Sequence, residues 1–135
     1  MQQVNPAWVH QEDAEGCGLA TIAMISGRSY AEVKATVDAW GWQATDWATS
    51  GCTHYTLDRY LAADGWYLQR RYEAWPELLK EPFAPIHYAS VVQSSGRGHF
   101  VVVLADGVVL DPYREGHYNL SDWGKVNQLV GLVRP

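Results

Sequence analysis

The chain has 135 residues, of which 47% are hydrophobic and 19% are charged, and its formal net charge is −5. This size and balance are typical of one globular domain that buries its core without disulfide bridges, so we expect a single domain over residues 1–135. The acidic charge and the scarcity of basic clusters argue against a nucleic-acid partner. The apolar runs are shorter than the roughly 18 residues of a membrane-spanning helix, and no signal-peptide pattern opens the chain. We therefore expect no membrane insertion and a soluble, cytoplasmic protein.

The first half of the chain has the pattern of three helices. An almost continuous apolar run closed by Gly27 predicts the first helix over residues 17–26. Ser29 and Glu32 have the spacing of a capping box that begins the second helix, and Thr53 can cap the third. The predicted ends of these helices are Gly27, Gly41 and Asp64-Gly65.

The second half has the pattern of a sheet. The predicted strands cover residues 66–72, 86–92, 99–104, 108–111 and 129–133. Residues 99–104 are apolar on both faces, which indicates a central strand covered on both sides, with the first helix packed against it. We further expect one helical turn at residues 75–79 and a mobile loop at residues 93–98. Helices followed by strands predict an α+β fold.

Cys17 stands at the N-terminus of the first predicted helix. Unpaired backbone N–H groups and the positive end of the helix dipole favour the thiolate form of a cysteine there. Gly16 and Gly18 leave the sulfur open to a carbonyl, and Gln11, six residues upstream, can direct its amide at a developing oxyanion. The alternative is that Cys17 is a small buried hydrophobe. We expect Cys17 and Cys52 to stay reduced.

The spacing of Gln11 and Cys17 resembles that of papain-like cysteine peptidases. The pattern of a glutamine, acidic residues, Cys-Gly, a small residue and an apolar helix ending in glycine is closer still to the bacteriocin-processing, double-glycine peptidases. The residues that carry it are Gln11, Asp13, Glu15, Cys17-Gly18, Ala20, Met24 and Gly27. The likeness continues, in family order, through Gly51-Cys52-Thr53, Pro85-Ile86-His87-Tyr88, Gly98-His99-Phe100-Val101-Val102-Val103 and Asp111-Pro112. It therefore covers nearly the whole chain.

This resemblance implies a papain-like fold in which N-terminal helices, with the nucleophile helix, pack on a C-terminal, mainly antiparallel sheet. It implies that His99 is the general base, that Asp111 orients it, and that Gln11 with the Cys17 backbone N–H binds the oxyanion. The implied reaction is hydrolysis of a peptide or protein amide bond through a thioester, with a preference for small residues, glycine above all, before the cut. No metal and no cofactor is required, and a bacterial or phage-type context is implied.

The hairpin between residues 104 and 108 provides a test based on geometry alone. If the loop is Ala105-Asp106-Gly107 with Gly107 left-handed, Asp111 lies opposite Val101 and on the same face as His99. If Asp106-Gly107 is a two-residue turn, Asp111 moves to the other face and contact with His99 is lost. The catalytic interpretation therefore predicts the three-residue loop.

Other interpretations of the same residues stay open. The chain could be a catalytically inactive binding module on a peptidase-like fold, or a thiol hydrolase that acts on a non-peptide amide. Transporters that process bacteriocins join this kind of domain to membrane and ATP-binding domains, which this sequence lacks. We therefore expect a free-standing domain or a piece of a larger protein, and the leader-peptide substrate is not carried over. We expect His87 to be a packed sheet residue.

Overall fold

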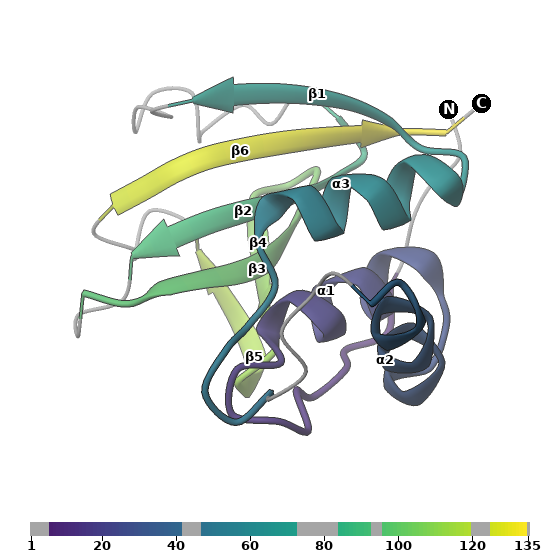
Figure 1. Cartoon of the computed structure of the whole chain (residues 1–135). Coiled ribbons are helices and arrows are strands. Elements are labelled where there is room, and N and C mark those ends of the chain that lie inside the picture. The colour runs from purple at the N-terminus through teal and green to yellow at the C-terminus, as the bar shows by residue number, and fades with distance from the viewer. Residues whose placement is uncertain (1–5, 42–46, 73–83, 93–95, 120–124, 135) are drawn as a thin grey trace.

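The structure is a computed structural model of the chain that describes residues 6–41, 47–72, 84–92, 96–119 and 125–134. Three helices and six strands occupy these ranges (Figure 1). The helices are α1 (Cys17–Ser26), α2 (Tyr30–Ala39) and α3 (His54–Ala63). The strands are β1 (Tyr67–Tyr72), β2 (Ile86–Val92), β3 (Gly98–Leu104), β4 (Val108–Asp111), β5 (Arg114–Asn119) and β6 (Lys125–Val133). The helical turn predicted at residues 75–79 and residues 93–95 of the predicted loop lie outside the described residues.

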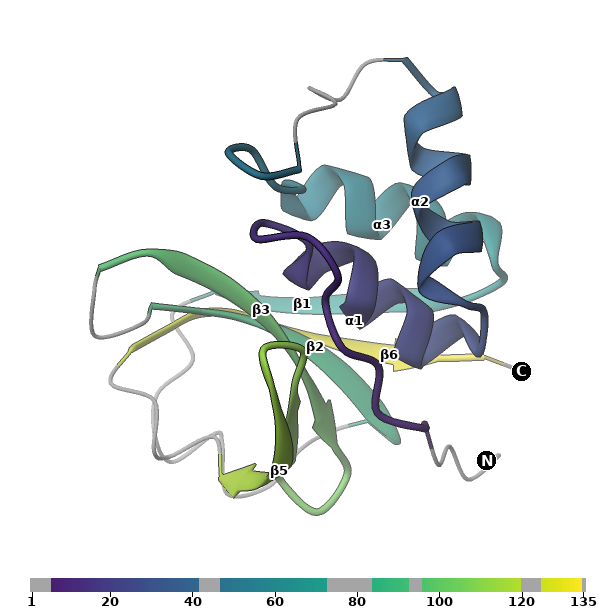
Figure 2. The same cartoon turned by 90° about the horizontal axis from the view of Figure 1, so that it is seen from below.

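All three helices gather on one face of the sheet (Figure 2). The strand order is β1-β6-β2-β3-β4-β5, and every neighbouring pair is antiparallel. The predicted α+β fold, with helices packed on a mainly antiparallel sheet, is therefore confirmed. No helix within the described ranges combines the length and the apolar composition that crossing a membrane requires.

α1 is buried along almost its whole length. Its residues from Gly18 to Ile25 are all buried, as expected for a helix that is apolar or small on every side. Gly27 closes it with a left-handed φ of 73°, and the Gly27 N–H donates to the Ala23 carbonyl oxygen at 3.0 Å. The predicted bounds of this helix, residues 17–26, are confirmed, and it packs against β3 as expected.

The other two helices begin where the sequence predicts, for different reasons. The Ser29 hydroxyl oxygen accepts the Glu32 backbone N–H at 3.1 Å, which is the predicted cap of α2. Thr53 occupies the N-cap position of α3, but its side chain makes no capping hydrogen bond, so that expectation was wrong. α3 is held instead by the burial of Leu57 and Leu61, both fully inaccessible to solvent.

β3 is an interior strand of the sheet, covered on both faces as predicted. Val102 belongs to the main core, which includes α1. Val101 and Val103 belong to a second apolar cluster, against which Tyr118 of β5 packs. Successive side chains of a strand point to opposite faces, so one apolar run supplies both clusters. His99, near the start of β3, is therefore positioned by a strand that packs against an apolar cluster on each face of the sheet.

β5 was not predicted from the sequence. Its residues are polar or glycine apart from one tyrosine, and it lies at the edge of the sheet, where one side of the strand has no neighbour to demand apolar residues. It follows β4 through a tight turn in which Asp111 pairs with Arg114. β6 also starts earlier than expected, at Lys125 rather than residue 129.

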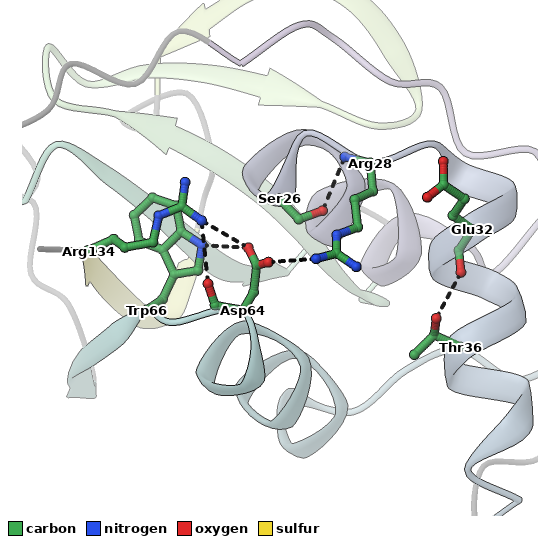
Figure 3. A network of polar contacts seen from close by, with 7 residues as sticks. All are labelled: Ser26, Arg28, Glu32, Thr36, Asp64, Trp66 and Arg134. Atoms are coloured by element: carbon green, nitrogen blue, oxygen red, sulfur yellow. Dashed lines mark hydrogen bonds and ion pairs between the residues drawn. The ribbon is translucent and has the colours of Figure 1, made fainter.

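Asp64, just after α3, connects Arg28, which follows α1, to Arg134, which follows β6 (Figure 3). Its carboxylate accepts hydrogen bonds from Arg28 at 3.1 Å, from the Trp66 indole at 3.1 Å and from Arg134 at 3.4 Å. The Arg134 guanidinium also stacks on the Trp66 ring at 4.5 Å. The network lies by Ser26, at the C-terminal end of α1 (Figure 3). Cys17 is at the other end of this helix.

Candidate active site

Cys17 is the first residue of α1 and is partly exposed. The residue after it, Gly18, is packed so closely against Cys52 that a Cβ added there would lie 2.7 Å from the Cys52 Cβ. Only glycine allows this approach. Both cysteines are free, as expected. The Cys17 sulfur thus lies at the N-terminal end of α1, and the first turn of this helix after Cys17 is packed into the core.

His99 and Asp111 form a buried pair on neighbouring strands. His99 Nε2 lies 2.6 Å from Asp111 Oδ1, and the two side chains are 5% and 3% exposed. The same carboxylate oxygen accepts the Tyr113 backbone N–H at 2.9 Å, and the indole N–H of Trp8 donates to the Asp111 backbone carbonyl at 2.8 Å. These contacts fix the carboxylate, which in turn fixes the orientation of the imidazole ring.

The hairpin register agrees with the three-residue loop. Val102 pairs with Leu110 and Val103 pairs with Val109. Continuing this register by one residue places Asp111 opposite Val101. Gly107 is left-handed, with φ of 86°, and its N–H donates to the Leu104 carbonyl at 2.9 Å. The predicted three-residue loop, which sets Asp111 on the same sheet face as His99, is confirmed.

The Cys17 thiol meets His99 although 82 positions separate the two residues. Burial lowers the pKa of His99, but hydrogen bonds to Asp111 and to Cys17, together with the charges of both partners, outweigh it and raise the pKa to about 9. Because Nε2 is directed at Asp111, Nδ1 is the ring nitrogen left for the sulfur. His99 is therefore cationic near neutral pH and stands between two groups that favour its charge.

Gln11 is buried next to residues 12–16, which precede Cys17 and are called the nucleophile loop because the sequence predicts Cys17 to be the nucleophile. The Gln11 amide is turned into that loop. Its Nε2 donates to the carbonyl oxygens of Asp13 at 3.2 Å and Ala14 at 2.9 Å. Its Oε1 is buried and has no hydrogen-bond partner among the described residues. The Gln11 backbone N–H donates to the Pro112 carbonyl at 2.9 Å, beside Asp111. In this structure both amide hydrogens of Gln11 are thus occupied by the loop rather than left open for an oxyanion.

The loop before Cys17 is held by a second set of contacts that the sequence did not suggest. The Tyr30 hydroxyl donates to Asp13 at 2.7 Å and accepts the Asp13 backbone N–H at 3.3 Å, and Lys34 pairs with the same carboxylate at 3.0 Å. The Tyr30 hydrogen bond, with help from Lys34, holds the pKa of Asp13 below its ordinary value against the effect of burial. A Cβ on Gly16 would lie 2.0 Å from the Tyr30 oxygen. Glycine is therefore required at the N-cap of α1.

Two further candidates have structural explanations. His87 is fully buried in β2, with Nδ1 3.0 Å from the Val103 carbonyl oxygen and Nε2 accepting the Ala84 N–H at 3.2 Å. Burial lowers its pKa, so it is a neutral packed residue, as predicted. Burial also raises the pKa of Cys52, with smaller contributions from Cys17 and Asp38. Within the described ranges, no three His, Cys, Asp or Glu side chains are grouped to hold a metal ion.

The fold is shared with two solved peptidase domains. One is the peptidase domain of Streptococcus ComA, a bifunctional ABC transporter involved in a quorum-sensing pathway, with a TM-score of 0.67 and 14% identity over 94% of this chain and 97% of that one. The other is a double glycine motif protease from an AMS/PCAT transporter, solved in complex with the leader peptide, with a TM-score of 0.68 and 16% identity over 98% of this chain and 94% of that one. No protein-family model and no curated protein sequence matches the chain. The likeness is thus one of fold, which this chain shares with these two peptidase domains.

Proposed function

We propose that the chain is a cysteine peptidase that hydrolyses a peptide or protein amide bond through a thioester, within one papain-like domain over residues 1–135. The observation that carries the proposal is the buried imidazole of His99, held between the carboxylate of Asp111 and the thiol of Cys17. Thiol acyl transfer needs a nucleophile, a base beside it and a group that orients the base. All three roles have an occupant here.

In the proposed reaction the Cys17 thiolate attacks the carbonyl carbon and forms a C–S bond. The His99 imidazolium then gives its Nδ1 proton to the amine nitrogen as the C–N bond breaks, which leaves a thioester. Neutral His99 next removes a proton from water, whose oxygen attacks the thioester carbonyl and releases the acid product and the thiolate. Asp111 accepts the Nε2–H of His99 and keeps it in place throughout.

The oxyanion would be bound first by the backbone N–H of Cys17. The opening N–H groups of a helix have no partner within that helix, and this one lies at the residue that attacks. Gln11 would add a second donor by releasing one of its two loop carbonyls as the substrate enters. We therefore assign Gln11 a double role, in bracing the loop and in stabilising the transition state.

The proposed substrate is a peptide or protein with small residues, glycine above all, before the cut. Support comes from the likeness in fold to two peptidase domains, one of which is a double glycine motif protease solved in complex with the leader peptide. The proposed place of action is the cytoplasm of a bacterial or phage-infected cell. Peptides with Gly-Gly or Gly-Ala before the cut should be cleaved, and bulky replacements at those positions should be excluded by steric clash.

The test is a digest of a peptide library by the full chain, with Cys17→Ala and His99→Ala as the inactive variants and Cys52→Ala as the matched cysteine control. Cleavage that is lost in the first two variants and kept in the third supports the proposal. Turnover that survives in Cys17→Ala ends it. If no peptide is cleaved, turnover of a non-peptide amide substrate would point to another thiol hydrolase. Alkylation by iodoacetamide that is equally slow at Cys17 and Cys52, without any cleavage, would point to a binding module.

A further inference from the structure

An ion pair joins the nucleophile loop to the start of the strand that carries the base. Glu15 lies two residues before Cys17, and Arg97 lies two residues before His99. The Arg97 guanidinium pairs with the Glu15 carboxylate, so the contact spans the same 82 positions as the thiol and the imidazole. Glu15 is only 19% exposed in this pair, whereas Arg97 is 62% exposed. The pair therefore connects a largely buried group on one side to a solvent-facing one on the other.

The backbones at the two ends of this contact are held in different ways. The Glu15 N–H donates to the Trp47 carbonyl at 2.8 Å, and the Glu15 carbonyl lies so close to Gly51 that an added Cβ there would meet it at 2.8 Å. Trp47 itself is 3% exposed. The backbone of Glu15 is thus fixed by its contacts with Trp47 and Gly51.

At Arg97 the backbone is constrained from the β3 side, where Gly98 pairs with Val92 of β2. Gly96 and Gly98 flank Arg97, Gly96 has a left-handed φ of 86°, and a Cβ built on either glycine would meet nothing within 4 Å. Glycine carries no side chain to pack and loses the most conformational freedom on ordering. Of these three residues, only Arg97 has a side chain with which to anchor the approach to His99.

We propose that Glu15 and Arg97 are positioning residues that hold the beginning of β3 against the nucleophile loop, and so keep His99 within reach of Cys17. Because Glu15 is fixed, its ion pair with Arg97 restrains the chain at Arg97, and His99 is two residues further along. This proposal rests on the proposed function. It assigns the pair no contact with the substrate.

The test compares Glu15→Gln, Arg97→Gln and the double variant in the full chain. Arg28→Gln is the matched control, because Arg28 is 52% exposed and its pair with Asp64 lies at the other end of α1. Two rates are measured at equal folded fraction: kcat/KM on a peptide with Gly-Gly before the cut, and alkylation of Cys17 by iodoacetamide. Each is measured at about 0.01 M and about 1 M salt, where the screening length falls from about 30 Å to about 3 Å.

Each single variant should lower both rates by about two- to fivefold, and the double variant by no more than the larger single loss. High salt should bring the wild type towards the variants and leave the variants unchanged, while Arg28→Gln should match the wild type. Additive losses, or single variants that behave like Arg28→Gln, would overturn the proposal. If the wild type cleaves no peptide, the peptidase function fails by itself, and the alkylation rates still decide whether the pair positions His99. Wild-type Cys17 that reacts no faster than a free thiol would also overturn it.

Discussion

The contacts of Asp111 separate two contributions that a carboxylate makes to a base, its charge and its hydrogen bonding. The His99 Nε2 and the Tyr113 N–H both point to Oδ1. The other oxygen, Oδ2, has Arg114 Nε at 3.8 Å, on a side chain that is 60% exposed. An asparagine can therefore place its amide oxygen at the Oδ1 position and its NH₂ group at the Oδ2 position. Asp111→Asn should remove the charge and keep both hydrogen bonds.

The pKa of His99 sets the size of the effect. Its rise from 6.5 to about 9, net of burial, corresponds to about 3 kcal/mol at about 1.4 kcal/mol per pH unit. Cys17 and Asp111 both contribute to this stabilisation of the charged imidazole. The hydrogen bond between His99 and residue 111 is kept in Asp111→Asn. We therefore expect Asp111→Asn to lower the alkaline limit of activity by about one pH unit from about 9. This should lower kcat/KM by about five- to tenfold above about pH 9 and change it little at pH 7. Asp111→Ala should lower kcat/KM by about 10³-fold, because the imidazole then loses its orienting acceptor.

The assay is the pH profile of kcat/KM, together with the pH dependence of unfolding by urea. Since the folded pKa of His99 is raised, its contribution to stability is fully present below about pH 6.5 and is lost as the pH rises through about 9. This loss should be smaller in Asp111→Asn. If the asparagine variant is as impaired as the alanine variant, or if its alkaline limit stays at that of the wild type, the division into charge and orientation is incorrect.

Three further predictions concern other parts of the molecule. Gln11→Ala should lower kcat by about 10²-fold through loss of an oxyanion donor, and a fall in urea stability without a fall in kcat would limit Gln11 to bracing the loop. His87 is neutral in the fold and its pKa is lowered, so the unfolding free energy of the wild type should fall as the pH drops below about 6.5. In His87→Gln this part of the pH dependence of the unfolding free energy should be lost. Equal pH dependences of the two proteins in urea titrations at about pH 5 to 7 would contradict this. Asp64→Ala should lower the free energy of unfolding by about 1–3 kcal/mol, measured by heat or urea, because three donors lose their acceptor. It should leave kcat/KM unchanged. Unchanged stability would show that Arg28 and Arg134 find other partners.

Much of the fold could be predicted because the decisive signals are local. The apolar run of α1 and the left-handed Gly27 set both ends of that helix to the residue. The β3–β4 register was open between two loops from the residues alone, and the catalytic interpretation predicted the one that the structure has. β5 could not be found in this way, because an edge strand is defined by its neighbour rather than by its own composition. The Asp-Pro pair at residues 111–112 was a turn signal that could have indicated a strand after it.

The candidate site was only partly accessible from the sequence. Spacing relates Gln11 to Cys17 along the chain, but it does not reveal which way an amide faces, and here the amide faces the loop carbonyls. The Tyr30 contact to Asp13 joins residues 17 positions apart on different elements. Such contacts arise from tertiary packing, which a residue pattern in one segment does not encode.

The burial of α1 has a consequence for how this domain can diversify. Because Gly18 to Ile25 are all buried, α1 has no exposed face that could accept substitutions without effect on stability. Any change of side-chain size there alters the packing of the core. Residues 47–53 include Cys52, which packs on Gly18, and residues 96–98 include Arg97, which pairs with Glu15; apart from Trp47, both segments are exposed or partly buried. A mutational scan should therefore find α1 intolerant throughout, while variants with altered substrate choice arise in those two segments. New specificities would then evolve by exchanging loops around an unchanged nucleophile helix.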